Sequence, residues 1–249
     1  MTAPLYIFSY GANPEFPLIQ ATNGQLYGTT NDGGSGACPL RCGTVFEMAP
    51  KGALTTVLSF GITSGDTGAY PDGLVQATDG YLYGTDYYGG ANGYGVIFKM
   101  TLGGGLTTLY DFCPPGGPSY CPGGAYTDGA LVQHTNGTLY GATYGGGIAG
   151  TCTGAGAEGC GTIFSMSVGL GPFVKTLPTS GKVGADVTIL GTGLSGATSV
   201  TFHGTASSFT VNATGTSIST TVPAGATTGP VQVVTPGGTL SSNVTFRVP

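Results

Sequence analysis

The chain has 249 residues, enough for one large β domain or for two domains of ordinary size. Only 7% of the residues are charged and the formal net charge is −5, so no basic patch is available to neutralise nucleic-acid phosphates or anionic lipids. No stretch approaches the ~20 apolar residues of a transmembrane helix. We therefore expect no nucleic-acid partner and no membrane insertion.

The first residues, Met1-Thr2-Ala3-Pro4-Leu5, have neither the basic region nor the apolar run of a signal peptide. We expect either that a leader has been removed or that the sequence is a segment of a longer chain.

Glycine is unusually frequent, with 49 residues, or about a fifth of the chain. A high glycine content can mean disorder, but 40% of the residues are hydrophobic, which argues against it. Frequent tyrosine, phenylalanine and valine among the glycines favour an all-β protein with many tight turns.

Two short phrases recur three times along the chain. The first phrase reads Asn23-Gly24-Gln25-Leu26-Tyr27-Gly28-Thr29, then Asp79-Gly80-Tyr81-Leu82-Tyr83-Gly84-Thr85, then Asn136-Gly137-Thr138-Leu139-Tyr140-Gly141-Ala142. The second phrase reads Gly43-Thr44-Val45-Phe46-Glu47-Met48, then Gly95-Val96-Ile97-Phe98-Lys99-Met100, then Gly161-Thr162-Ile163-Phe164-Ser165-Met166. The tyrosines of the first phrase, Tyr27, Tyr83 and Tyr140, lie 56 and 57 residues apart, a period typical of repeat architectures built from one supersecondary unit.

The second copy predicts four short antiparallel strands, at residues 74–78, 81–85, 95–100 and 106–112. The Asp79-Gly80 pair between the first two strands indicates a hairpin, for which we predict a type I′ turn. Four strands in a unit of this length are typical of a β-propeller blade, so residues 1–170 are expected to form a propeller-like array of three units. The third copy lacks its fourth strand.

The missing strand has a candidate at the start of the chain. Leu5 to Gly11 resembles Leu106 to Phe112, so this segment could complete the third unit by pairing with Ile163 and Phe164. The same pairing between two molecules would produce a homo-oligomer or a head-to-tail filament. The residues of this self-assembly strand are Leu5, Tyr6, Ile7, Phe8 and Tyr10.

Six cysteines form three short-range pairs, each in a variable loop between repeat phrases. The loops contain no histidine and no Cys-x-x-Cys motif, so local disulfides are favoured over a metal site. Disulfides indicate an extracellular or cell-surface location. The predicted disulfides are Cys38–Cys42, Cys113–Cys121 and Cys152–Cys160.

Residues 171–249 differ in character, since no cysteine or tyrosine occurs after the linker Leu170-Gly171-Pro172. Alternating strands at 187–189, 200–202, 209–211, 231–233 and 244–248, separated by turn residues, predict a small immunoglobulin-like β-sandwich.

The repeats resemble a family of large secreted bacterial proteins built from tandem units of the form DG-x-LYGTT…GG…GTVFxM…G-x-LTTLxxF. The resemblance covers residues 5 to about 168 and implies no activity. The C-terminal part resembles an IPT/TIG domain through Pro178 to Gly181, Val187 to Leu194, Val222 to Gly225, Thr228 to Val231 and Thr235 to Gly238. Bacterial versions of that domain act mostly as spacers or interaction modules.

Catalytic residues are scarce in this sequence, with 11 acidic residues and two histidines. His134 replaces an alanine of the other copies and is interpreted as a tolerated substitution. Asp72 and Asp128, with Glu15 as a rough counterpart, could bind Ca²⁺, although we favour a role in capping loops. We expect no enzyme, no cofactor and no metal site.

Two further sets of residues could bind a ligand. Gln20, Gln76 and Gln133 recur on the innermost strands and either line a channel or satisfy backbone groups. Tyrosines in the glycine-rich loops could stack on sugars or contact proteins, or could pack over the strand edges. These tyrosines are Tyr87, Tyr88, Tyr94, Tyr120, Tyr126 and Tyr144.

The sequence therefore predicts a non-catalytic extracellular structural or adhesive protein. The alternative is a glycan-binding module of a secreted carbohydrate-active protein. A cluster of the loop tyrosines on one rim would favour glycan binding.

Overall fold

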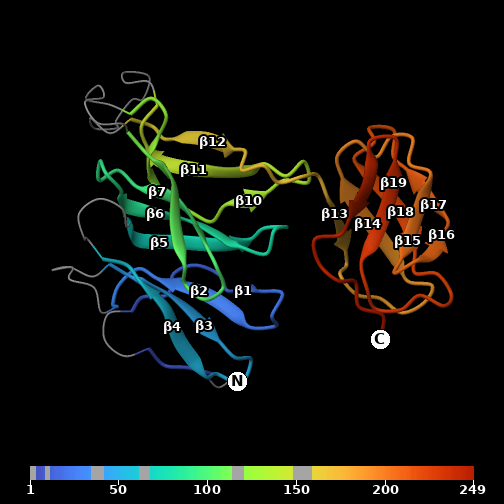
Figure 1. Cartoon of the computed structure of the whole chain (residues 1–249), viewed down its shortest axis with the longest axis horizontal. Helices are drawn as coiled ribbons and strands as arrows, with labels where there is room; N and C mark the ends of the chain where they lie inside the picture. Colours follow the sequence, from blue (N-terminus) through green and yellow to red (C-terminus); the bar gives the residue numbers. More distant parts are fainter. Residues whose placement is uncertain (1–3, 9–11, 35–41, 62–67, 114–120, 148–158) are drawn as a thin grey trace. The chain divides into compact units, whose positions relative to one another are not determined.

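The computed structural model describes residues 4–8, 12–34, 42–61, 68–113, 121–147 and 159–249 (Figure 1). These residues are all-β and contain antiparallel four-stranded sheets, which confirms the predicted fold class. In this described part, no helix is long and apolar enough to cross a membrane.

The chain divides into two compact units, which are described separately. The first unit comprises residues 1–133 and 139–166, and the second comprises residues 134–138 and 167–249. The predicted boundary after residue 170 lies four residues beyond this division, and the short turn 134–138 belongs with the second unit.

The first unit contains three four-stranded sheets, one for each copy of the repeat. Sheet 1 consists of β1 (Ile19–Gln20), β2 (Leu26–Thr30), β3 (Thr44–Met48) and β4 (Leu54–Ser59). Sheet 2 consists of β5 (Gly68–Gln76), β6 (Leu82–Gly89), β7 (Val96–Met100) and β8 (Leu106–Asp111). Sheet 3 consists of β9 (Ala125–Thr127), β10 (Val132–Gln133), β11 (Leu139–Gly145) and β12 (Thr162–Met166).

Sheet 3 differs from the other two in how its four strands are arranged. Both β9 and β10 pair with β11, so together they correspond to the single strand β5 of sheet 2. β12 is therefore the last strand of sheet 3, and in the described residues no strand lies in the position of β4 and β8.

The hairpin turns are not of the predicted type I′. In sheet 2 the N–H of Gly80 donates to the carbonyl of Ala77, and the N–H of Ala77 donates to the carbonyl of Tyr81. Only Gly80 has a positive φ, of 83°, because Asp79 keeps an ordinary backbone conformation. This is a three-residue loop with a type I turn followed by a left-handed glycine. The Asp79 carboxylate accepts a hydrogen bond from the N–H of Tyr81, which explains why aspartate or asparagine recurs there.

The three sheets follow one another in chain order, each packing against the next (Figure 1). We call the side of each sheet that meets the following sheet its far face and the opposite side its near face. Between sheets 1 and 2, Tyr27 and Val45 of the far face pack with Leu82 and Phe98 of the near face in one buried cluster. The core of the first unit thus lies between sheets.

Polar contacts repeat at both junctions between sheets. The Gln76 amide donates to Thr22 Oγ1 (3.2 Å) and accepts from the N–H of Thr22 (2.8 Å). The amide of Gln133 makes the same pair of bonds to Thr78, each 3.1 Å long. These glutamines therefore join neighbouring sheets, in agreement with the interpretation that they satisfy backbone groups.

The start of the chain does not form the predicted strand of sheet 3. Residues 4–8 form no strand, and the Phe8 ring lies 5.3 Å from that of Phe46 in sheet 1. The ring pairs Phe60–Phe98 (5.6 Å) and Phe112–Phe164 (5.4 Å) make the same contact between consecutive sheets. Leu5-Tyr6-Ile7-Phe8 therefore corresponds to Leu109-Tyr110-Asp111-Phe112, three residues from the predicted alignment. Tyr10 lies outside the described residues.

The second unit is a sandwich of two four-stranded sheets with a single buried apolar cluster between them. One sheet contains β13 (Val174–Leu177), β14 (Asp186–Gly191), β18 (Ser217–Thr221) and β17 (Phe209–Val211). The other contains β16 (Thr205–Ser207), β15 (Ser199–Phe202), β19 (Val231–Thr235) and β20 (Gly238–Ser241). The strand predicted at 244–248 is wrong, because Phe246 and Arg247 make only isolated bridges.

Candidate functional site

Six tyrosines gather at one end of sheets 2 and 3, where β6 and β11 finish. The ring of Tyr87 lies 4.7 Å from that of Tyr88, stacks on Tyr126 at 5.2 Å and lies 6.5 Å from Tyr144. Tyr126 also contacts Tyr88 at 5.5 Å and Tyr94 at 5.6 Å. Tyr70, which the sequence analysis did not predict, belongs to the same cluster, because its ring lies 5.5 Å from that of Tyr88. We call these residues the tyrosine patch: Tyr70, Tyr87, Tyr88, Tyr94, Tyr126 and Tyr144.

The patch is formed mainly by strand residues and not, as predicted, by loop residues. Tyr70 lies in β5, Tyr87 and Tyr88 lie near the end of β6, Tyr126 lies in β9 and Tyr144 lies in β11, while Tyr94 is in the connection before β7. Tyr120, the sixth predicted residue, lies outside the described residues.

An unusual backbone conformation directs two rings into the patch. Tyr70 has a φ of 60° and Tyr126 a φ of 57°, a left-handed conformation that is uncommon for aromatic residues. The N–H of Tyr126 donates to the carbonyl of Tyr94, and the N–H of Tyr70 donates to the carbonyl of Cys42. Each left-handed tyrosine is thus fixed to the preceding sheet.

The sequence carries a signal for this feature. Gly68-Ala69-Tyr70-Pro71-Asp72 recurs as Gly124-Ala125-Tyr126-Thr127-Asp128, and the first copy reads Gly11-Ala12-Asn13-Pro14-Glu15. Asn13, at the equivalent position, has a φ of 37°. Because Asn13 replaces the tyrosine in the first copy, the patch lies on sheets 2 and 3.

Three rings of the patch are open to solvent. Tyr144 is 58% exposed, Tyr88 is 44% exposed and Tyr94 is 39% exposed. Tyr70, Tyr87 and Tyr126 are half-buried, and their rings contact the three exposed rings. A cluster of supported aromatic rings offers large, flat contact area at a small cost in conformational entropy.

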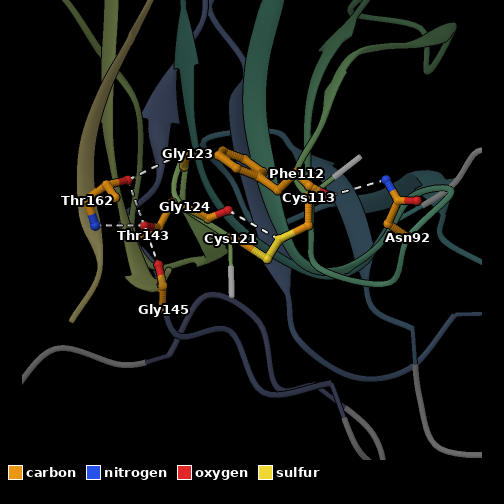
Figure 2. Close-up of a disulfide and its surroundings, with 9 residues drawn as sticks. All are labelled: Asn92, Phe112, Cys113, Cys121, Gly123, Gly124, Thr143, Gly145 and Thr162. Carbon is orange, nitrogen blue, oxygen red and sulfur yellow. Dashed lines mark hydrogen bonds between the residues drawn. A yellow bond between two sulfur atoms is a disulfide. The ribbon is translucent and has the colours of Figure 1, made fainter. Parts of the chain in front are cut away.

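A disulfide anchors the loop that leads into β9 and Tyr126. Cys113 is bonded to Cys121, with the two Cα atoms 5.2 Å apart (Figure 2). The carbonyl of Cys121 accepts hydrogen bonds from the N–H groups of Gly124 and Gly147, so the loop is joined to sheet 3. Cys42 and Cys160 are also disulfide-bonded. Their predicted partners, Cys38 and Cys152, lie outside the described residues.

Replacing Cys113 and Cys121 together with serine should lower the free energy of unfolding by about 2–3 kcal/mol, because the bond closes a short loop in the unfolded chain. Urea denaturation of the full chain under non-reducing conditions measures the change. An unaltered denaturation midpoint would show that the disulfide does not contribute to stability.

The acidic residues considered for Ca²⁺ differ in exposure. Asp72 is 3% exposed and its carboxylate accepts a hydrogen bond from the Thr85 hydroxyl, whereas Asp128 and Glu15 are exposed. His134 lies in the hairpin turn of sheet 3, where its Nδ1 accepts a hydrogen bond from the N–H of Asn136. Among the described residues, no group of three or more histidine, cysteine or acidic side chains is arranged to hold a metal ion.

Comparison with protein families accounts for both units. The model of the Gloeobacter/Verrucomicrobia repeat matches residues 4–153. The chain belongs to this repeat family. The model of the IPT/TIG domain matches residues 172–248, which correspond to the sandwich of the second unit.

Similarity to individual proteins is weak. No curated protein matches the sequence. Among solved structures, a fungal alcohol oxidase of the AA5 family in complex with copper shares 14% sequence identity at a TM-score of 0.40. The match covers 95% of this chain and 54% of the oxidase chain, so this chain spans about half the oxidase. A similarity at this level carries no argument about activity, and repeat and immunoglobulin-like domains of these kinds are typically non-catalytic.

Proposed function

We propose that this protein is a non-catalytic extracellular adhesive module and that its repeat domain binds glycans on the tyrosine patch. The observation that carries the proposal is the gathering of six tyrosine rings at one end of two adjacent sheets, with three of the rings exposed. A cluster of this kind is the feature that favours glycan binding over a purely structural role.

The chemistry of the patch suits a neutral, amphipathic ligand. A pyranose ring presents apolar C–H faces that can stack on tyrosine, and its hydroxyl groups can pair with phenol and backbone groups around the edge. The chain carries only 17 charged groups, so electrostatic attraction contributes little to recognition.

An extracellular location is supported by the disulfide Cys113–Cys121, since such bonds persist in oxidising compartments. An IPT/TIG domain is likewise compatible with an extracellular protein.

The second candidate is a structural protein that polymerises head to tail. The exposed far face of sheet 3 favours this role, with Ile163 80% exposed and Val132 58% exposed. The two surfaces meet at Tyr144, which lies on the same face of β11 as Tyr140 and so belongs to both, whereas Tyr88 lies outside the far face of sheet 3.

Replacing Tyr88 or Tyr144 with alanine should weaken binding to a glycan identified by array screening by about tenfold, equivalent to roughly 1.4 kcal/mol. Tyr81→Ala is the matched control, because Tyr81 is 38% exposed and lies outside the patch. Calorimetric titration of the full chain provides the affinities.

Two outcomes would contradict glycan binding at the patch. One is an array on which the wild-type chain binds no glycan. The other is a glycan whose affinity falls equally in the Tyr81→Ala control and in the two patch variants.

A further inference from the structure

The far face of sheet 3 exposes side chains whose equivalents are buried in both other sheets. Tyr140 is 37% exposed and Ile163 is 80% exposed. At the same positions, Tyr27 and Val45 of sheet 1 are 1% and 0% exposed, and Tyr83 and Ile97 of sheet 2 are 0% and 2% exposed. These positions are therefore buried wherever a further sheet follows, and in sheet 3 the same face is exposed to solvent.

The near face of sheet 1 is open in the complementary way. Leu18 is 44% exposed, whereas its equivalents Leu74 and Leu131 are 4% and 3% exposed. Gln20 is exposed, although Gln76 and Gln133 at the same position each bind a threonine of the preceding sheet. Sheet 1 thus offers the half of the junction that the far face of sheet 3 lacks.

The segment Leu5–Phe8 occupies the position, relative to sheet 1, that the end of the fourth strand of a preceding sheet would occupy. Its Phe8 packs on Phe46, and the Leu5 carbonyl lies against Gly52 as the Val57 carbonyl lies against Gly104. Val57 belongs to β4, the fourth strand of sheet 1. Leu5 and Ile7 are nevertheless 61% and 78% exposed, because no preceding sheet covers them in the described residues.

Among the described residues β12 is the last strand of sheet 3, and its outer edge is the place where such a segment fits. In sheet 2, Ile97 pairs with Tyr110 and Val96 pairs with Asp111 across β7 and β8. The equivalent pairs join Ile163 to Tyr6 and Thr162 to Ile7. Strand addition of this kind satisfies backbone groups along an open edge.

We propose that a second copy of this chain docks the near face of its sheet 1, together with its residues Leu5–Phe8, onto the far face and free edge of sheet 3. The contact continues the junction that the chain already forms twice within itself. The two surfaces differ, so the association is head to tail and produces an open filament or a closed ring. The inference rests on the structural role proposed above and does not require glycan binding, although the far face shares Tyr144 with the tyrosine patch.

Single substitutions at the two surfaces should prevent self-association without unfolding the chain. In sedimentation velocity at increasing concentration, the wild-type chain should form oligomers, whereas Ile163→Glu and Leu18→Glu should each remain monomeric. Val183→Glu is the matched control, because Val183 is 54% exposed in the sandwich and should leave oligomers unchanged. Unaltered circular dichroism and thermal unfolding verify that each variant is folded.

Mixing the two variants provides the sharper test. The Ile163→Glu chain retains an intact sheet 1 surface and the Leu18→Glu chain retains an intact sheet 3 surface, so an equimolar mixture should form one-to-one dimers and nothing larger. A monomeric wild-type chain, or oligomers that survive both substitutions, would overturn the proposal. An isologous contact would leave the mixture monomeric, and this result would overturn it as well.

The strand register gives a second measurement. A chain carrying Thr162→Cys and Ile7→Cys should form a ladder of disulfide-linked oligomers on mild oxidation, and a chain carrying Val183→Cys and Ile7→Cys should not. Equal ladders from both variants would contradict the register. Repeating the assembly assay with Tyr88→Ala separates the two proposals, since that variant should assemble normally even where it no longer binds glycan.

Discussion

Replacing Asp86 with threonine should increase the free energy of unfolding at pH 8 by about 2–4 kcal/mol, because an uncompensated buried charge is removed. Asp86 is fully buried in β6, and both of its carboxylate oxygens lack a hydrogen-bond partner among the described residues. Burial raises its pKa well above the ordinary value of 3.8, and the nearby carboxylate of Asp72 raises the pKa further.

The same shifts determine how stability depends on pH. Burial also raises the pKa of Asp72 to about 7, although the Thr85 hydroxyl opposes the shift. Between pH 4 and pH 7 the folded state therefore binds more protons than the unfolded state, and stability falls as the pH rises. Asp86 adds to this decline through its own raised pKa, so the stability of the Asp86→Thr variant should fall less steeply as the pH rises.

Threonine is the appropriate replacement because the other two copies of the repeat have it. Thr30 in sheet 1 donates to the carbonyl of Asp32 at 2.7 Å, and Thr143 in sheet 3 donates to the carbonyl of Gly145 at 2.8 Å. In both cases the acceptor is the carbonyl two residues further along the chain, which for a threonine at position 86 is the carbonyl of Tyr88. Its hydroxyl can therefore be satisfied where the carboxylate is not.

Denaturation of the full chain at pH 5, 7 and 8 measures the effect. Asp186→Thr is the matched control, since Asp186 is exposed in β14 and its replacement should change stability by less than about 0.5 kcal/mol. Equal gains in the two variants, or a gain for Asp86→Thr that is larger at pH 5 than at pH 8, would show that the buried charge is not the cause.

Much of the fold could be predicted because the sequence pattern of the strands occurs in three copies. Leu82 and Tyr83 alternate between the two faces of one strand, and the same alternation in every copy identifies the strands. The alignment of Leu5–Phe8 was wrong by three residues, because two spaced leucines, Leu106 and Leu109, offer alternative matches. The deciding contact, Phe8 on Phe46, lies between sheets and leaves no periodic signal along the chain.

The tyrosine patch could be predicted only in part. Their glycine-rich surroundings predict the contact residues Tyr87, Tyr88, Tyr94, Tyr126 and Tyr144, and the structure brings these five together. Tyr70 was missed because it precedes a proline and resembles an ordinary loop residue. Its left-handed backbone follows from the position that it shares with Tyr126 and Asn13, and this comparison could have found it.

Asp86 shows what a comparison between copies can add. In the second copy it replaces the threonine of the other two, and Val96 replaces the threonines Thr44 and Thr162 that pair with them. The substitution is visible in the sequence, but burial of the carboxylate depends on the stacking of sheet 2 between its neighbours. A position within a strand does not by itself reveal which side is enclosed.

Replacing Gly84 with alanine should lower the free energy of unfolding by about 2 kcal/mol, and replacement with valine should lower it further. A Cβ at Gly84 would lie 2.5 Å from Cζ of Phe98 and 3.0 Å from Cδ2 of Leu74. Phe98 is fully buried between sheets 1 and 2, so its ring has no space into which it can move. Gly103→Ala is the control, because a Cβ there meets no atom within 4 Å.

The same crowding explains why the repeat phrase contains a glycine at all. A Cβ at Gly28 would lie 2.6 Å from Phe46, and Gly141 is covered in the same way by Phe164. In each sheet the phenylalanine of the neighbouring strand lies across the glycine, and in sheets 2 and 3 its ring meets the preceding sheet. Loss of stability in Gly84→Ala with no change in Gly103→Ala, measured by urea denaturation, would show that the glycine is retained for this packing. Equal stability of both variants would mean that the ring can shift, and the Leu-Tyr-Gly phrase would then need another explanation.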